Sequence, residues 1–190
     1  MKKILIAFDL DGCLINLMAV FRRFLLEIHG VEIKSQKTFS LRSSTGLLSK
    51  DIWHLIHLSY KEVKSTPIFP GATKLLTKLY EKTNEPPMIL TARPFDSVDD
   101  TYAVVKKLMK KTPFQLILKH PKASKGQYLR GYKFFLEDRR KTALELSDLG
   151  FTVPLIKKAY NHIPDIDSYP NIYYVDGVHT LIPDIDNFIS

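Results

Sequence analysis

Cysteine is almost absent from this chain: Cys13 is the only one among 190 residues. A single thiol forms no internal disulfide, which excludes the disulfide-stapled class of small secreted domains and favours a reducing compartment. No apolar run approaches the roughly 20 residues that a membrane span needs. The N-terminal apolar run is short and is interrupted by Asp9, so we expect no signal peptide. We therefore expect a cytoplasmic protein without a membrane partner.

Acidic residues are outnumbered, because 28 Lys and Arg stand against 20 Asp and Glu and give a net charge of +8. A basic balance can mark a partner that carries phosphate groups. The basic residues are scattered in pairs, however, and aromatic residues do not alternate with them as base-stacking surfaces require. A nucleic-acid partner is therefore possible, but the scattered distribution of the basic residues does not favour it.

The pattern of apolar residues predicts an α/β protein. With 45% hydrophobic residues, the chain can bury the core of one domain, or of one domain with an insertion. Strand-like runs alternate with amphipathic helical runs, which predicts a central parallel sheet with helices on both faces, a Rossmann-like three-layer sandwich. The apolar run at residues 4–14 contains the first predicted strand, and the later ones are 87–91, 114–119, 133–137, 152–156 and 172–175. The predicted helices are 71–82, 97–111, a short one from 123, and 141–149.

A segment of different character follows the first strand. Residues 18–29 have helical apolar spacing, and a serine- and lysine-rich stretch with a second helical patch at 50–63 leads to Pro67 and Pro70. We interpret residues 16–68 as a helical cap inserted into a core formed by residues 1–15 and 69–190.

The first predicted strand ends in two carboxylates, Asp9 and Asp11, directly before Gly12. Buried central strands do not normally end in such a pair, and burying the charge requires a counter-ion. Open parallel sheets bind ligands at the carboxyl ends of their strands, so the pair could hold a divalent cation and an anionic substrate. The structural alternative is an Asp-Gly turn with both side chains in solvent.

Three later segments supply what a phosphate site needs. Thr91 ends the second core strand, and its hydroxyl and the free backbone amides at Ala92 can bind phosphoryl oxygens. Lys125 begins the short helix after the third strand, and Glu137 and Asp138 form a second acidic pair after the fourth. Each residue has an ordinary explanation as a capping or surface residue. Together they predict a phosphate site.

This arrangement resembles the haloacid dehalogenase superfamily of phosphotransferases over nearly the whole chain. Asp9-Leu10-Asp11-Gly12 resembles its motif I, Thr91 motif II, Lys125 motif III and Glu137-Asp138 motif IV. The family's small C1-type helical cap occurs directly after motif I. The phrases FFLEDRRKTALEL and LIKKAYN are similar to its 5'-nucleotidase-like branch, which includes the pyrimidine deoxyribonucleotidases.

Two points of the resemblance need comment. Three other lysines compete with Lys125 for the motif III position, namely Lys119, Lys122 and Lys133. Cys13 stands where the family commonly has threonine, a change expected to affect packing more than chemistry.

The resemblance and the residues together imply a mechanism. Asp9 would attack phosphorus to form an aspartyl-phosphate, and Asp11 would protonate the leaving oxygen and then activate water. Mg2+ would be bound by Asp9, the backbone carbonyl of Asp11, and Asp138, which Glu137 would support.

In the same scheme, Thr91, Ala92 and Lys125 would bind the phosphoryl oxygens. The implied activity is that of a Mg2+-dependent phosphohydrolase.

The resemblance implies a nucleoside monophosphate as substrate, and the cap should decide its identity. Arg93 could contact a second phosphate or pair with Asp96, and Tyr160 and Asn161 could border the site or form a turn. The cap residues that could contact base or sugar are Phe21, Arg42, Ser43, Ser44, Trp53, His54 and Tyr60.

Three alternatives remain at this stage. The substrate could be the phosphorylated end of a nucleic acid or another small phosphoester. The chain could also be a non-catalytic nucleic-acid-binding module on the same scaffold, although the retention of Asp9, Asp11, Thr91 and Asp138 argues against lost catalysis.

Overall fold

The computed structural model describes residues 5–33 and 36–186. The predicted core and cap also include residues 1–4, 34–35 and 187–190, and these parts lie outside the described residues. The strands are β1 Leu5–Phe8, β2 Met88–Thr91, β3 Gln115–Leu118, β4 Tyr132–Leu136, β5 Val153–Ile156 and β6 Ile172–Val175. The α-helices are α1 Leu17–His29, α2 Leu41–Thr45, α3 Ser49–Lys61, α4 Ala72–Thr83, α5 Val98–Met109 and α6 Arg140–Asp148. Short 3-10 helices are η1 Phe95–Ser97, η2 Gly126–Tyr128, η3 Ile166–Ser168 and η4 Val178–Leu181.

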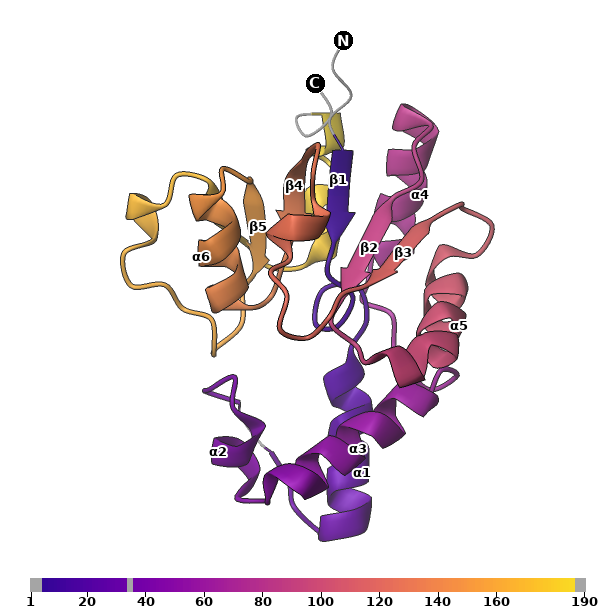
Figure 1. Ribbon diagram of the computed structural model, residues 1–190, viewed down its shortest axis with the longest axis vertical. Coiled ribbons are helices and arrows are strands. Elements are labelled where there is room, and N and C mark those ends of the chain that lie inside the picture. The colour runs from indigo at the N-terminus through magenta and orange to yellow at the C-terminus, as the bar shows by residue number, and fades with distance from the viewer. Residues whose placement is uncertain (1–4, 34–35, 187–190) are drawn as a thin grey trace.

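The sheet is parallel throughout. Strands β3, β2, β1 and β4 are hydrogen-bonded in that order, and β5 pairs with β6. The backbone N–H groups of Phe135 and Glu137 donate to the carbonyls of Thr152 and Pro154, each at 3.1 Å, which joins β4 to β5. The predicted central parallel sheet is confirmed, and its strands run side by side in Figure 1.

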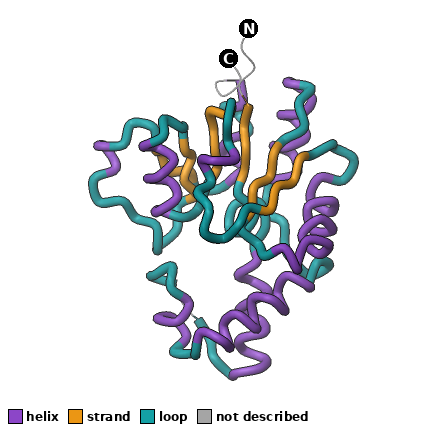
Figure 2. Tube along the Cα trace, viewed as in Figure 1, coloured by secondary structure: helices purple, strands orange, loops and turns teal. Residues whose placement is uncertain are grey.

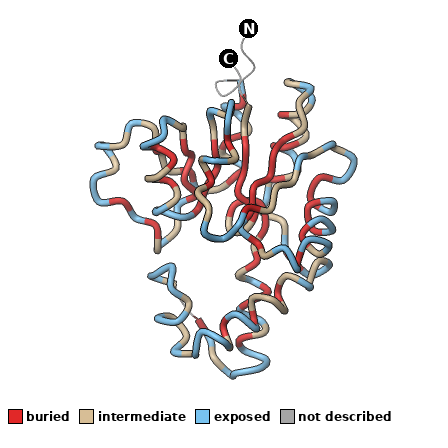
Figure 3. Tube along the Cα trace, viewed as in Figure 1, coloured by how far each residue is buried: buried red, intermediate tan, exposed pale blue. Residues whose placement is uncertain are grey.

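Strands β2 and β5 are buried along their whole length, and therefore on both faces, since successive side chains point to opposite sides of a sheet. Phe8 and Leu136 pack with the apolar sides of α4 and α5, whereas Ala7 and Phe135 pack with that of α6. Each large side chain buried in this way contributes about 1.5–3 kcal/mol. The result is the predicted three-layer sandwich, whose strands form the buried centre in Figure 3.

Helices α1, α2 and α3 lie beyond the carboxyl ends of the strands, and α3 contacts the start of α5 (Figure 2). We call the segment 16–68 the cap. It has an apolar cluster of its own, which includes Phe21, Leu25 and Leu55. None of the helices in the described part of the chain has both the length and the apolar character that a membrane crossing requires.

The two chain segments that connect cap and core run side by side. The N–H of Asn16 donates to the carbonyl of Pro67 at 2.8 Å, and the N–H of Phe69 donates to that of Leu14 at 3.0 Å. Lys107 on α5 donates to the carbonyls of Val63, Lys64 and Thr66 at 2.8–3.2 Å. The lysine thus ties the returning connection to the core.

Helix α2 was not predicted from the sequence. It has only five residues, and its serine-rich sequence lacks an apolar period. The side chain of Ser40 accepts the N–H of Ser43 at 3.3 Å and caps its start, while Gly46 ends it with φ of 72°.

Candidate active site

The carboxyl ends of three adjacent strands bring the sequence-predicted residues together. Asp9 follows β1, Thr91 ends β2, and Glu137 and Asp138 follow β4. All four are buried, and all line one cavity. Residues far apart in the sequence meet because parallel strands end at the same edge of the sheet.

Lys125 lies at the centre of this group. Its Nζ donates to Oδ1 of Asp9 and to Oε2 of Glu137, both at 2.7 Å, and lies 4.7 Å from the ring centroid of Phe135. Burial alone would lower the pKa of this lysine, but the two carboxylates outweigh that effect and raise it. Lys125 is therefore a permanently charged bridge between two strand ends.

The competing lysines have other surroundings. The Nζ of Lys119 donates to the carbonyls of His120, Pro121 and Ala123, all in its own loop. Lys122 and Lys133 are exposed. Among these four lysines, Lys125 alone forms a hydrogen bond with Asp9 in the described part of the chain.

The carboxylate of Glu137 orders the loop after β4. Its Oε2 accepts from Lys125, and its Oε1 accepts the backbone N–H groups of Asp138 and Arg139, each at 3.0 Å. Because both carboxylate oxygens of Glu137 accept hydrogen bonds from the protein, we infer that Glu137 fixes the positions of Lys125 and Asp138 rather than binding a ligand.

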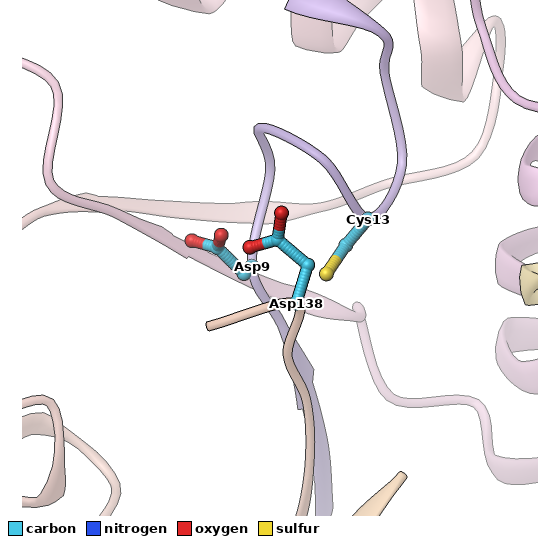
Figure 4. A group of neighbouring side chains, drawn as sticks. All are labelled: Asp9, Cys13 and Asp138. Carbon is cyan, nitrogen blue, oxygen red and sulfur yellow. The ribbon is translucent and has the colours of Figure 1, made fainter. Parts of the chain in front are cut away.

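Asp9 and Asp138 form a candidate cation site together with Cys13. One ligand atom of each residue lies within 4.8 Å of the others, and Figure 4 shows the two carboxylates next to each other with the thiol beside Asp138. Gly12, with φ of 85°, leaves this space open, because a Cβ there would collide with the Asp138 carboxylate. The two carboxylates of this cluster offer hard oxygen donors, which suit Mg2+.

The charges of the site fit a divalent cation. Burial raises the pKa of Asp9 well above its ordinary value, and burial with the neighbouring Glu137 raises that of Asp138 to about 7. Among the described residues, Asp9 and Glu137 share one cation, Lys125, Asp11 pairs with Arg93, and the Asp138 carboxylate forms no ion pair. A divalent cation bound between Asp9 and Asp138 would favour the carboxylate form of both.

Asp11 is held by Arg93. The guanidinium donates from Nε at 2.9 Å and from Nη2 at 2.7 Å to the two carboxylate oxygens, and it lies 4.5 Å from the ring centroid of Tyr60 on α3. This corrects the expectation that Arg93 pairs with Asp96, which lies instead 4.0 Å from His57. The expected contact of Arg93 with a second phosphate stays a prediction. A cap residue is thus in contact with the arginine that positions Asp11.

We expect Arg93→Met to lower both stability and turnover. The change leaves the partly exposed Asp11 carboxylate without two charged donors and removes the cation–π contact with Tyr60, a loss of about 2 kcal/mol. Urea denaturation and kcat/KM would measure the two effects. Arg130→Met, at an exposed arginine, is the control and should change neither; equal effects of the two variants would contradict a positioning role for Arg93.

Tyr160 and Asn161 border the site, and Asn161 also forms a turn. The Tyr160 hydroxyl donates to Oδ2 of Asp138 at 2.5 Å, and Asn161 Nδ2 donates to the backbone carbonyl of Asp138 at 2.8 Å. Oδ1 of Asn161 accepts the N–H of Lys158 at 3.0 Å, which closes the turn after β5. Both residues therefore fix the position of Asp138.

The cavity in front of these residues has a volume of about 830 Å3 and lies between core and cap. One face of α3 lines it with Trp53, Ile56 and Tyr60, a helical spacing that the sequence already contained. Phe39, which sequence reasoning missed, lines it from the loop before α2 and packs edge-on against Tyr160 at 5.7 Å. The cap thus gives the cavity an aromatic wall.

Four of the predicted substrate contacts do not line this cavity, namely Arg42, Ser43, Ser44 and His54. Arg42 and Ser43 are exposed and do not line the cavity, because Ser43 is held in the cap of α2 by Ser40. Phe21 touches the cavity but is almost wholly buried in the apolar cluster of the cap. His54 lines a separate hollow between α3 and the start of α5.

Comparison with solved structures places this fold among known ones. A haloacid dehalogenase superfamily hydrolase from Ehrlichia chaffeensis has a TM-score of 0.60 with 15% identity, and the match covers 100% of each chain. A hydrolase from Pseudomonas syringae has a TM-score of 0.62 with 15% identity over 98% of this chain and 100% of that one. CbbY from Rhodobacter sphaeroides, solved with phosphate, has a TM-score of 0.60 with 14% identity over 93% and 95%. No family model and no curated protein matches the sequence. The chain therefore has a haloacid dehalogenase-like fold.

Proposed function

We propose that this protein is a Mg2+-dependent phosphohydrolase that acts through an aspartyl-phosphate on Asp9. The observation that carries the proposal is the buried Lys125 bridge to Asp9 and Glu137, set beside Asp11, Asp138 and Thr91 in one cavity. Solved structures with the same fold include hydrolases of the haloacid dehalogenase superfamily, which supports this activity.

The reaction has two steps. A carboxylate oxygen of Asp9 bonds to phosphorus as the bond to the leaving oxygen breaks, and Asp11 gives that oxygen a proton. Asp11 then takes a proton from water, whose oxygen bonds to phosphorus and releases Asp9 and phosphate. Arg93 donates two hydrogen bonds to the Asp11 carboxylate and so orients it beside the reaction centre.

Phosphoryl transfer depends mainly on positive charge and hydrogen-bond donors that stabilise the phosphoryl oxygens. Lys125, the Thr91 hydroxyl and the backbone amide of Ala92 would supply donors from the core side of the cavity. Mg2+ would be held by Asp9, Asp138 and the Asp11 carbonyl, and it supplies further charge to these oxygens when bound.

We further propose a nucleoside monophosphate as substrate. The cavity is large enough for a nucleotide, and Trp53, Tyr60 and Phe39 offer aromatic rings on the wall opposite the catalytic carboxylates. The test is phosphate release from a panel of nucleotides, sugar phosphates and phosphorylated oligonucleotides, with Mg2+ and with a chelator. Mg2+-dependent release, fastest from nucleotides, is expected. No release from any phosphoester would contradict the proposal.

Mg2+ should stabilise the protein more at high pH than at low pH. Because the pKa of Asp138 is raised to about 7, its carboxyl is protonated below that pH in the metal-free protein, and a cation must displace the proton. By the same shift, metal-free stability should fall as pH rises from the ordinary value of 3.8 to about 7. The measurement is the rise in Tm on adding Mg2+ at about pH 6 and about pH 8.

The control for this experiment is Asp138→Asn, which should abolish most of the Mg2+-dependent rise at both pH values. An equal rise in Tm at the two pH values for the unaltered protein would contradict proton competition at Asp138.

A further inference from the structure

One wall of the cavity carries positive charge that the reaction centre does not use. The volume of about 830 Å3 is that of a site for a whole small molecule rather than for a phosphate group alone. The wall consists of the loop that begins at residue 119 and the start of α6. Its basic residues, apart from Lys125, are Lys119, Lys122, Arg139 and Lys141.

Three of these cations have no acidic partner among the residues that the structure describes. In the described part of the chain, Lys122, Arg139 and Lys141 form no ion pair, whereas Arg93 and Lys125 are both paired with carboxylates. In addition to the carboxylates of the reaction centre, the cavity lining includes the carboxylate of Glu145, which accepts a hydrogen bond from Ser124. The wall therefore has a surplus of positive charge that faces the ligand space.

Arg139 is held in place without using its donors. Its guanidinium lies 4.7 Å from the ring centroid of Phe39, which itself packs against Tyr160. Within the described residues its side chain makes no hydrogen bond. Stacking fixes the plane of a guanidinium while its N–H groups stay free to bind an oxyanion.

The cations on this wall also repel one another. Burial, together with the nearby charges of Lys125 and Arg139, lowers the pKa of Lys119. The adjacent helix α6 has no side-chain cap at its N-terminus, which adds positive potential at the same place. A bound anion would relieve this repulsion.

The aromatic wall and the basic wall together indicate the chemistry of the ligand. The reaction centre binds one phosphoryl group, the cap rings favour a planar group, and the basic wall fits a further anion. We propose that the preferred substrate is a nucleotide with a second phosphate on the leaving group, held by Lys122, Arg139 and Lys141, an inference that rests on the phosphohydrolase function proposed above. A nucleoside 3',5'-bisphosphate and the phosphorylated end of an oligonucleotide share this chemistry.

The test measures binding without turnover. The Asp9→Asn protein with Mg2+ is titrated calorimetrically with thymidine 5'-monophosphate, thymidine 3',5'-bisphosphate and the 5'-phosphorylated dithymidine dinucleotide. We expect the bisphosphate to bind about tenfold more tightly than the monophosphate, since an exposed ion pair contributes up to about fivefold. The advantage should shrink as salt is raised.

Variants that neutralise lysines of the basic wall test whether these residues cause the tighter binding of the bisphosphate. In the Asp9→Asn background, Lys122→Gln with Lys141→Gln should lower the ratio of the two dissociation constants from about ten to about two, since Arg139 still contacts the second phosphate. The matched control is Lys74→Gln with Lys106→Gln, at exposed lysines outside the cavity, which should keep the full ratio. Circular dichroism checks that both double variants are folded.

The outcomes separate the two proposals. Equal affinity for monophosphate and bisphosphate, or an advantage that the Lys122 and Lys141 changes leave undiminished, overturns the second-phosphate inference. Tight binding of the dinucleotide supports nucleic-acid ends as the source of the ligand, and tight binding of the bisphosphate alone supports a small nucleotide. Failure of the unaltered protein to hydrolyse any phosphoester would instead contradict the phosphohydrolase function.

Discussion

Replacement of Asp9 by asparagine should reduce turnover by roughly 10^4-fold or more, the scale seen when a catalytic nucleophile is removed. The amide keeps the shape of the side chain and can still accept a hydrogen bond from Lys125, which retains its bond to Glu137. The amide also carries no charge to desolvate. We therefore expect the Tm to stay within about 4 °C of the unaltered protein, or about 1 kcal/mol.

The measurements are kcat on the best substrate of the panel and a thermal melt. Asp148→Asn, at an exposed carboxylate at the end of α6, is the matched control and should leave both values unchanged. An Asp9→Asn protein with kcat within tenfold of the unaltered protein would contradict Asp9 as the nucleophile.

Replacement of Lys125 by methionine should damage both stability and catalysis. The change leaves Asp9 and Glu137 buried without their shared cation, which costs roughly 3–5 kcal/mol in the free energy of unfolding. Removal of a charged donor from the phosphoryl group should lower kcat by about 10^2- to 10^3-fold. The stability loss should shrink as pH falls, because protonation of Asp9, whose pKa burial raises, removes one unpaired charge.

Lys119→Met is the control for this variant, because Lys119 is also buried but bonds only to carbonyls of its own loop. Water can reach that loop, so we expect a loss of about 1 kcal/mol and little change in kcat. Urea denaturation at two pH values and steady-state kinetics provide the data. If the Lys119 variant lost more activity than the Lys125 variant, the assignment of the phosphate-binding lysine would be wrong.

The fold was largely predictable because local signals agreed with one another. Short apolar runs such as Met88–Thr91 alternate with segments of helical apolar spacing such as α5. Few folds other than a parallel sheet between helices accommodate this alternation. The short helix α2 escaped prediction because side-chain capping by Ser40, and no apolar period, defines it. The position of the catalytic edge followed from the sheet, since the ends of parallel strands meet.

Contacts across the cavity were not predictable in the same way. Asp11 and Arg93 are 82 residues apart, and the sequence around each residue does not predict that the two side chains pair. Phe39 lies in a loop without periodicity, and only the folded chain brings it to Arg139 and Tyr160. The choice of Lys125 among neighbouring lysines likewise depends on the three-dimensional path of the loop before β4.

The most direct test of the account is to trap the covalent intermediate. The protein is mixed with its substrate and Mg2+, quenched with acid within one turnover, and reduced with borohydride, which converts an aspartyl-phosphate to homoserine. Mass spectrometry of the peptide that contains Asp9 should then show homoserine at that position, and the same treatment without substrate should not. Modification at another residue, or an unmodified Asp9 throughout a time course in which phosphate is released, would contradict nucleophilic catalysis by Asp9.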